Sequence, residues 1–479
     1  MPFPFALPTT SAFSFSKYFI SDSHPSLPLS TSTYRGVLRD SLKRHKRLPP
    51  NEQSANLGNI LLSLNNYIPY LLALDAGLGN QPVAGEHLDV VLKSTPTLEW
   101  RLTISDNPIP GKAMGRLKIK SLEYEIYFVL STLAYTQTLL ARASLHSLYS
   151  SATSSPTTEQ RTLAITTATK HLMSAASVHD YISTRSDSLS SDPPCVDITM
   201  SASRALSFLA MAEATLLAVL KDDPYPAAVA QGRNKNDKEW MIKAPDIPKV
   251  RAHLFARLCL AAAEHASNAH SLLSTSSGKG KVDGELLKYV DDLKKSGRGK
   301  ACRFFGIDSE LSGQNGTGIA WLQAGVNELG FSLSRKEDGS KKGFSFGRAK
   351  KEWTEKREDK KVESGAAWGS DAGRLEESRV IEMLDAKWNK MNDTINTQEI
   401  PPTGPLIASM PSGRNMYELK PFEPPALDHS VLESMRAPPD RVDDYGSESS
   451  DEEREYREPV GAFPGTKGDY SASGSNSYY

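Results

Sequence analysis

Two histidines in the segment EHASNAH have residue types that could bind a metal ion. His265 and His270 stand five positions apart within a stretch of helical periodicity. At about 100° per residue their side chains point roughly 140° apart, whereas a zinc pair on one helix face needs a spacing of four. We therefore predict no metal site here and no metal cofactor for the chain.

Glycine-rich segments and cysteines are the remaining residues that could serve nucleotide binding or covalent catalysis. The segments GKGKVDG (278–284) and GQNGTG (313–318) match neither a phosphate-binding loop nor a dinucleotide fingerprint, and neither follows a predicted parallel strand. We interpret both as flexible loops. No GxSxG elbow is present, and Cys259 lies between leucines in an apolar helix, as a small core residue does. We predict no catalytic residue and no cofactor, which favours a binding protein over an enzyme.

Length and composition limit the class of protein. The chain has 479 residues, 39% of them hydrophobic, and a formal net charge of -1, so no global charge favours nucleic acid or an anionic surface. The three cysteines are far apart, which indicates a reduced, intracellular protein. The first residues lack a basic segment, and we find no fully apolar window of about 18 to 20 residues. We expect neither a signal peptide nor a membrane span.

The rest of the chain is organised around the segment PPCVDITMSASRALSFLAMAEATLLAVLKDD, residues 193–223. Pro193 and Pro194 block a helix upstream, Thr199 or Ser201 can cap its start, and the step into Pro224 ends it. The helix between these residues is apolar nearly all round. It must be buried on both sides, or buried on one side while it exposes an apolar strip to a partner.

The other segments predict a mainly α protein with a small β element near residue 100. LEWRLTIS (98–105) alternates as a strand or hairpin arm does. Pro69 should kink or end the helix in which it lies. Long antiparallel helices with wide apolar faces favour a helical array over a compact bundle. The expected helices cover residues 56–76, 116–155, 156–184, 248–273, 285–295, 319–329 and 374–397.

Charge is concentrated in three runs. Residues 35–47 carry six basic residues against one acid, and residues 341–361 carry nine against four, a net of +5 in each. Either run is a solvated helix face or a patch for a membrane or an acidic partner. Residues 440–458 hold nine acids and three bases, net -6, and such a tail cannot bury enough apolar surface to order itself. We predict a folded domain over residues 1–430 and a disordered tail over 431–479.

Several of these segments, in this order, resemble the BRO domain family, which Alix and related endosomal-sorting proteins share, and within it the PalC-type fungal pH-response regulators. The resemblance covers roughly residues 1–430 and includes no V-shaped second domain of the Alix kind. The segments that carry it are LEWRLTISD (98–106), SLEYEIYFVLSTLA (121–134), residues 193–223, IAWLQAGVNELG (319–330) and a closing strap, EIPPTGPLIASMPSGRNMYELKPFEPP (399–425).

The resemblance implies a curved, TPR-like helical solenoid with a small β-hairpin. It implies a hydrophobic groove that accepts the C-terminal amphipathic helix of the polymer-forming ESCRT-III subunit, a helix-in-groove interaction. It further implies a cytoplasmic scaffold, recruited to the plasma membrane or to endosomal membranes. There it would support the alkaline-pH signal in which a calpain-like protease cleaves the PacC transcription factor.

An ungapped match to the family places five residues at the groove. Leu216 and Leu217 fall at its apolar positions, and Val229 falls at another. Lys170 matches a lysine that can meet acidic residues of the incoming helix, while Thr166 replaces a second such lysine, so the electrostatic share of binding should be weaker. The alternatives are ordinary core positions for the leucines and a solvated surface position for Lys170.

Four functions remain open at this stage. The first is a non-catalytic adaptor of ambient-pH signalling, and the second is a general BRO-domain adaptor in multivesicular-body cargo sorting. The third is a hydrolase or transferase whose site assembles only in space. The fourth is a basic helical repeat that binds RNA or membranes through residues 35–47 and 341–361, which strongly salt-dependent binding would reveal. We favour the first, with no nucleic-acid partner.

Overall fold

The structure is a computed structural model that describes residues 2–106, 115–149, 157–186, 193–226, 229, 249–275, 280–331, 357 and 368–438. One compact unit runs from Met1 to Arg436. The predicted disordered tail lies outside the described residues from position 439 on. The insert at 231–245 and nearly all of the basic run at 341–361 lie outside them too.

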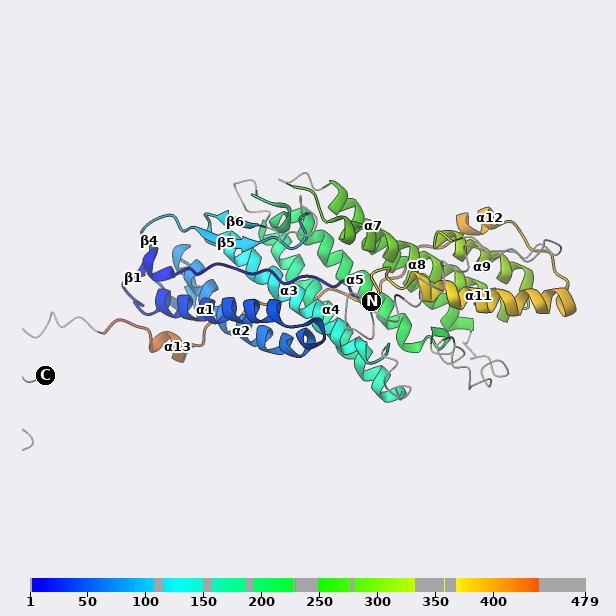
Figure 1. Ribbon diagram of the computed structural model, residues 1–479, viewed down its shortest axis with the longest axis horizontal. Helices are drawn as coiled ribbons and strands as arrows, with labels where there is room; N and C mark the ends of the chain where they lie inside the picture. Colours follow the sequence, from blue (N-terminus) through cyan, green and yellow to red (C-terminus); the bar gives the residue numbers. More distant parts are fainter. Residues whose placement is uncertain are drawn as a thin grey trace, which may run out of the picture. The chain divides into compact units, whose positions relative to one another are not determined.

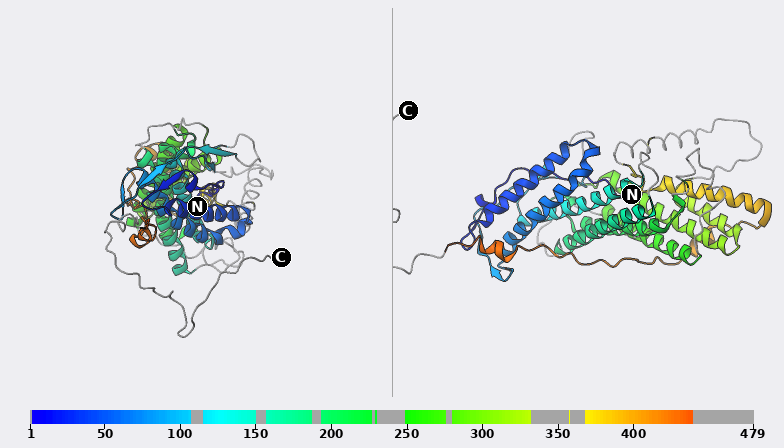
Figure 2. Two further views of the ribbon diagram at one scale, coloured as in Figure 1. Left: turned by 90° about the vertical axis from the view of Figure 1, so that its left-hand side faces the viewer. Right: turned by 90° about the horizontal axis from the view of Figure 1, so that it is seen from below.

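The described chain is mainly α-helical, as predicted (Figure 1). Its long helices are α1 (Leu27–Arg47), α2 (Pro50–Leu78), α3 (Leu122–His146), α4 (Thr158–Ser186), α5 (Met200–Asp222), α7 (Lys249–Thr275), α8 (Gly284–Leu311), α9 (Asn315–Glu328) and α11 (Arg374–Met391). Shorter helices are η1 (Phe15–Lys17), η2 (Val196–Ile198), η4 (Asn392–Asn396), α12 (Thr403–Ala408) and α13 (His429–Glu433). From α1 to α9 each long helix packs against the next along the chain, and α11 returns onto α8 and α9 (Figures 1 and 2). This is the predicted TPR-like array.

The strands form two-stranded antiparallel pairs. They are β1 (Phe19–Ser21) with β4 (Val90–Leu92), β2 (Pro82–Val83) with β3 (Glu86–His87), and β5 (Leu98–Arg101) with β6 (Arg116–Ile119). The β5–β6 pair confirms the hairpin near residue 100. Its second strand occupies residues that the sequence assigned to the following helix, which instead begins at Leu122, where the Ser121 side chain accepts a hydrogen bond from Glu123 N.

Proline and glycine residues stand inside two helices that are longer than the sequence predicted. Pro69 does not end α2, which continues to Leu78, because Ile68 and Leu71 on either side are buried and their packing outweighs the lost hydrogen bond. α8 extends well beyond 295 through Gly297 and Gly299. A Cβ at Gly299 would come within 2.6 Å of Leu329, so glycine is what allows the end of α9 to pack this closely. The segment GQNGTG is also not wholly a loop, since α9 begins at its Asn315.

Two buried arginines fasten distant helices. Arg35 on α1 pairs with Glu125 on α3 at 2.8 Å, and both side chains are buried. Arg35 therefore does not belong to the solvated basic run. Arg303 on α8 pairs with Asp223, just after α5, and with Glu377 on α11. Burial by itself would raise the pKa of Glu377, but Arg303 and Lys300 hold that pKa below its usual value.

Candidate functional site

The helix α5 lies between α4 and α7 in the array. It begins after Thr199, whose hydroxyl accepts a hydrogen bond from Ala202 N at 3.2 Å, which confirms one of the two predicted caps. Among the described helices α5 alone is long and apolar enough to cross a membrane, contrary to our expectation that none is, but 72% of its most apolar window is buried. Burial in the array therefore accounts for its composition.

One face of α5 carries Phe208, which is half-buried and stacks on His265 of α7 with 5.9 Å between the ring centroids. The C-terminal strap, residues 399–436, crosses the array and reaches the helices on both sides of α5 (Figure 2). On α7, Arg414 N donates to Arg257 O at 3.0 Å. On α4, the Tyr417 hydroxyl hydrogen-bonds to Thr169. The late segment that the sequence interpreted as a closing strap thus does span neighbouring helices.

The N-terminal segment covers another face of α5 (Figure 1). Glu213 on α5 is fully buried and accepts hydrogen bonds from Phe3 N at 3.0 Å and from the Tyr289 hydroxyl of α8 at 2.6 Å. Burial raises the pKa of Glu213 to about 7, and the two hydrogen bonds oppose that rise. The carboxyl group is thus engaged in holding the first residues against α5 and α8.

Trp368 completes the cover over α5. Its ring is buried in a core cluster with Leu217 of α5 and with residues of α3 and α4. Arg142 of α3 places its guanidinium 4.3 Å from the Trp368 ring centroid and donates hydrogen bonds to Trp368 O at 2.5 Å and to Pro2 O at 2.9 Å. Burial lowers the pKa of Arg142 to about 10. One arginine therefore fastens both the N-terminal segment and Trp368.

The structure brings some of the five predicted groove residues together and separates others. Leu216 is half-buried and packs, like Val229, against the cluster formed by α7, α8, α9 and α11. Leu217 is buried in a cluster with residues of α3 and α4 and with Trp368. Thr166 and Lys170 are exposed one turn apart on α4, beside Thr169, which the strap contacts. The two leucines therefore face different neighbours.

Sequence reasoning missed Trp368, Arg142 and the first residues of the chain as parts of this site. Phe3 and Phe5 recur at alternate positions, the pattern of an extended segment with one apolar side, and both rings pack onto other aromatics. That alternation was the available signal. Nothing local marks Trp368, because its partners lie more than 200 positions away in the sequence.

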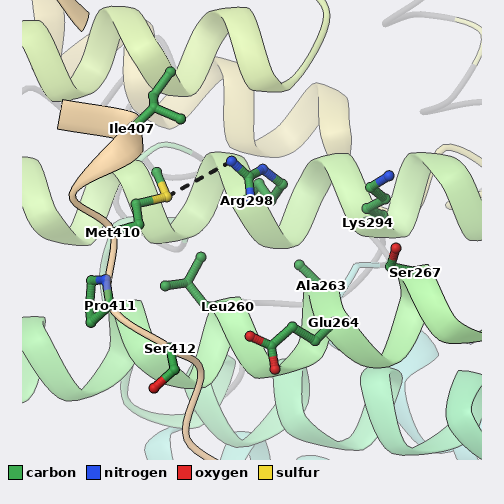
Figure 3. Close-up of a pocket in the computed structure, with 10 residues that line it drawn as sticks. All are labelled: Leu260, Ala263, Glu264, Ser267, Lys294, Arg298, Ile407, Met410, Pro411 and Ser412. Atoms are coloured by element: carbon green, nitrogen blue, oxygen red, sulfur yellow. Dashed lines mark hydrogen bonds between the residues drawn. The ribbon is translucent and has the colours of Figure 1, made fainter. Parts of the chain in front are cut away.

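A shallow cavity of about 430 Å³ lies between α7, α8 and the strap (Figure 3). Its floor and rim combine apolar and charged groups, with Arg298 in contact with the Met410 sulfur at 3.9 Å and paired with Glu328 at 2.6 Å. The lining residues are Leu260, Ala263, Glu264, Ser267, Lys294, Arg298, Ile407, Met410, Pro411 and Ser412. The strap forms one wall, so its position determines the shape of the cavity.

The three cysteines, which could serve covalent or metal chemistry, are turned inward. Cys195, Cys259 and Cys302 are buried free thiols, and burial raises the pKa of Cys259 to about 12. A thiol with so high a pKa stays protonated and unreactive at neutral pH. Within the described ranges no group of three or more His, Cys, Asp or Glu side chains could hold a metal ion.

The chain is similar to known proteins in both sequence and fold. No family model matches the chain. It is 40% identical over 515 aligned residues to the pH-response regulator protein palC of Emericella nidulans, with 100% of each chain covered. Two solved structures share the fold at 16% identity. ALIX in complex with the SIVmac239 PYKEVTEDL late domain has a TM-score of 0.54 over 91% of this chain, and the ALIX BRO1–CHMP4C complex has 0.51 over 88% of this chain and 95% of its own.

The extent of these matches differs. The chain spans about half of the longer ALIX chain, 51%, and nearly all of the BRO1 domain. The fold is therefore that of a BRO1 domain, and the full-length match to the curated regulator assigns the chain more narrowly. The chain belongs to the palC family of pH-response regulator proteins.

Proposed function

We propose that this chain is a non-catalytic adaptor of alkaline-pH signalling that binds the C-terminal amphipathic helix of the polymer-forming ESCRT-III subunit. The full-length identity of 40% to a pH-response regulator carries the signalling part. The BRO1 fold, which one solved ALIX domain displays in complex with CHMP4C, supports the helix-binding part. As a cytoplasmic scaffold recruited to the plasma membrane or to endosomal membranes, the protein would support cleavage of PacC by a calpain-like protease.

The proposed binding surface is centred on Leu216. This side chain is half-buried at the junction of two core clusters, so a partner helix can remove its remaining surface from water. Val229 packs on the same cluster and offers a second apolar contact. Lys170 is exposed on α4 and can pair with an acidic residue of the incoming helix, while Thr166 one turn away adds no charge. The interaction should therefore be mainly apolar.

Leu217 has a different role in this proposal. Leu217 is buried in a core cluster with Trp368 and with residues of α3 and α4, so in this structure it offers no surface to a partner. Leu216 is half-buried and does offer such a surface. We therefore place the first contact of the partner helix at Leu216 and assign Leu217 to the covered side of α5.

Calorimetric titration of the full chain with the ESCRT-III C-terminal helix tests the proposal. Burying a leucine side chain stabilises a complex by about 1.5–3 kcal/mol, and about 1.4 kcal/mol corresponds to a tenfold change in Kd. Leu216→Asp should therefore weaken binding at least about tenfold. Leu62→Asp is the matched control, since Leu62 lies on α2 and is 60% exposed, and it should bind as the wild type does.

The fold of each variant is checked by circular dichroism. If Leu216→Asp unfolds the array, Leu216→Ala gives the same test with a smaller effect. Equal binding by the wild type and a folded Leu216 variant would move the site elsewhere on the array. No binding by the wild type would reject the ESCRT-III part of the proposal. Unimpaired PacC cleavage at alkaline pH in cells that lack this protein would reject the signalling part.

A further inference from the structure

Basic side chains from two separate parts of the chain converge on a surface remote from α5. Arg39, Lys43, Arg44, Lys46 and Arg47 lie on the second half of α1. Arg101 and Arg116 face each other across the β5–β6 hairpin, and Lys118 follows on β6. We call this set the α1–hairpin basic surface. Each of these side chains is exposed or half-buried.

Acidic residues offset little of this charge. Asp40 accepts a hydrogen bond from Arg39 at 2.9 Å, and Glu99 lies opposite Lys118 in the hairpin register. The excess positive charge acts between α1 and the β5–β6 hairpin. The pKa of Lys46 is lowered by partial desolvation and by the charges of Arg101 and Arg116 on the hairpin. The pKa of Lys43 is lowered by partial desolvation, by Arg39 and by Arg116. Like charges held this close attract an anion that relieves their repulsion.

The surface also has a shape that suits a bound phosphate group. A shallow depression of about 430 Å³ is lined by Arg39, Asp40, Lys43, Arg44, Arg47 and Leu48. Guanidinium and ammonium groups that line such a depression can donate several charge-assisted hydrogen bonds to phosphate oxygens. On the outward side of α1, Val37 is 51% exposed, two turns before Arg44. An apolar side chain beside the charges can enter the interfacial region of a bilayer.

We propose that the α1–hairpin basic surface docks the protein onto an anionic membrane, with a phosphate-bearing lipid headgroup in the depression beside Lys43 and Arg44. A membrane fits better than an acidic peptide helix, because the charges spread over a helix and a hairpin without an apolar groove between them. It fits better than nucleic acid, because the described residues of α1 and the hairpin place no exposed aromatic ring among these basic side chains to stack on a base. The proposal goes beyond helix binding at α5, and the two surfaces share no residue.

Vesicle sedimentation with the full-length protein tests this docking. The vesicles contain phosphatidylcholine alone, phosphatidylcholine with phosphatidylserine, or phosphatidylcholine with a phosphoinositide. The test variant is Lys43→Glu with Arg44→Glu. The control is Lys387→Glu with Lys390→Glu, which makes the same change in net charge at exposed positions of α11. The test variant replaces two cations at the proposed membrane surface by anions, so it should bind anionic vesicles at least about tenfold more weakly. The control should stay within about twofold of the wild type.

Several results would overturn the proposal. The first is that the wild type binds neutral vesicles as strongly as anionic ones. The second is that it binds neither kind of anionic vesicle. The third is that the test and control variants lose vesicle binding equally. Preferential binding of a peptide with the sequence of residues 440–458, lost in the test variant, would assign the surface to the chain's own acidic segment instead.

A second variant, Arg116→Glu with Lys118→Glu on β6, repeats the test if the first does not fold. Calorimetry with the ESCRT-III helix should be unchanged in all these variants, so the failure of one proposal is distinguishable from the failure of the other.

Discussion

Arg142 and Trp368 are joined by two kinds of contact, although 226 positions separate them in the sequence. The guanidinium lies over the indole ring at 4.3 Å, and the same group donates to the Trp368 carbonyl. A second donation, to Pro2 O, ties the start of the chain to the same arginine. One side chain of α3 therefore holds both Trp368 and the start of the chain.

Replacing the ring at this position should uncover α5. Trp368→Ala removes a buried aromatic side chain and should lower the free energy of unfolding by about 3–5 kcal/mol if the site cannot collapse. It should also expose Leu217 and increase the binding of a hydrophobic dye. Urea unfolding and dye fluorescence measure the two effects. Trp368→Phe keeps an aromatic ring next to Arg142 and should lower the free energy of unfolding much less. An alanine variant as stable as the wild type would show that Trp368 does not contribute to the stability of the fold.

The buried Glu213 should make stability depend on pH. Because its folded pKa of about 7 lies above the ordinary value of 4.5, the folded state holds a proton that the unfolded state has released between these pH values. The free energy of unfolding should therefore fall as pH rises from about 4.5 to 7. Glu213→Gln keeps an oxygen that can accept from Phe3 N and Tyr289 and removes this dependence. Near pH 8 it should be more stable than the wild type by up to about 3 kcal/mol.

Urea unfolding at pH 5 and at pH 8 makes this comparison. The two proteins should differ little at pH 5 and most at pH 8. A Gln variant that is equally destabilised at both values would show that the carboxylate is charged in the folded state throughout the range.

The ion pairs of Arg303 should matter far more than those on the surface. Arg303→Met leaves the buried carboxylate of Asp223 without its ion-pair partner and leaves Glu377 with Lys300 alone, and it should cost about 3–5 kcal/mol of stability. Lys295→Met breaks a pair with Asp291 that is more than a third exposed and should cost less than about 0.5 kcal/mol. Thermal unfolding of both variants measures the contrast. Equal small losses would contradict the role of Arg303 as a link between α5, α8 and α11.

The end of the compact unit can be located by truncation. A chain that ends after residue 438 keeps Leu432 and Met435, which are buried in the core of the N-terminal helices, and the pair between Arg436 and Glu86 at 2.6 Å. It should be as stable as the full chain and should bind the ESCRT-III helix equally well. A chain that ends after 430 loses all three and should be less stable by about 1.5–3 kcal/mol for each buried side chain. Denaturant midpoints and calorimetry compare the two, and equal midpoints would place the end of the fold at 430.

Local signals in the sequence predicted helices and strands well where these depend on residues that are close together in the sequence. The prolines and Thr199 around α5 placed its ends correctly, and the alternation at residues 98–101 identified a strand. The helical array followed from the wide apolar faces of successive helices. These features are set by backbone geometry and periodicity, which a short window of sequence contains.

Features that depend on partners distant in the sequence were not predictable in this way. Arg35 belongs to a basic run by composition, yet Glu125 draws it into the core from 90 positions away. Gly299 suggested a break in α8 and instead permits contact with Leu329. Of the candidate site, Leu216 is half-buried and Lys170 is exposed, whereas Leu217 is buried in a cluster with a tryptophan that no local pattern marks.

The strap has a consequence for how the protein forms during synthesis. Helical arrays with contacts only between neighbours can fold progressively as they leave the ribosome. Here Arg436 binds Glu86 across 350 positions, and Gly413 lies so close to α7 that an added Cβ would come within 2.5 Å of Ala261 N. The packing around the first helices is therefore complete only after the strap, at the end of the described chain, has been synthesised and has bound. A chain released early, or one whose strap cannot close, would leave the surface that the strap covers exposed to proteases and chaperones.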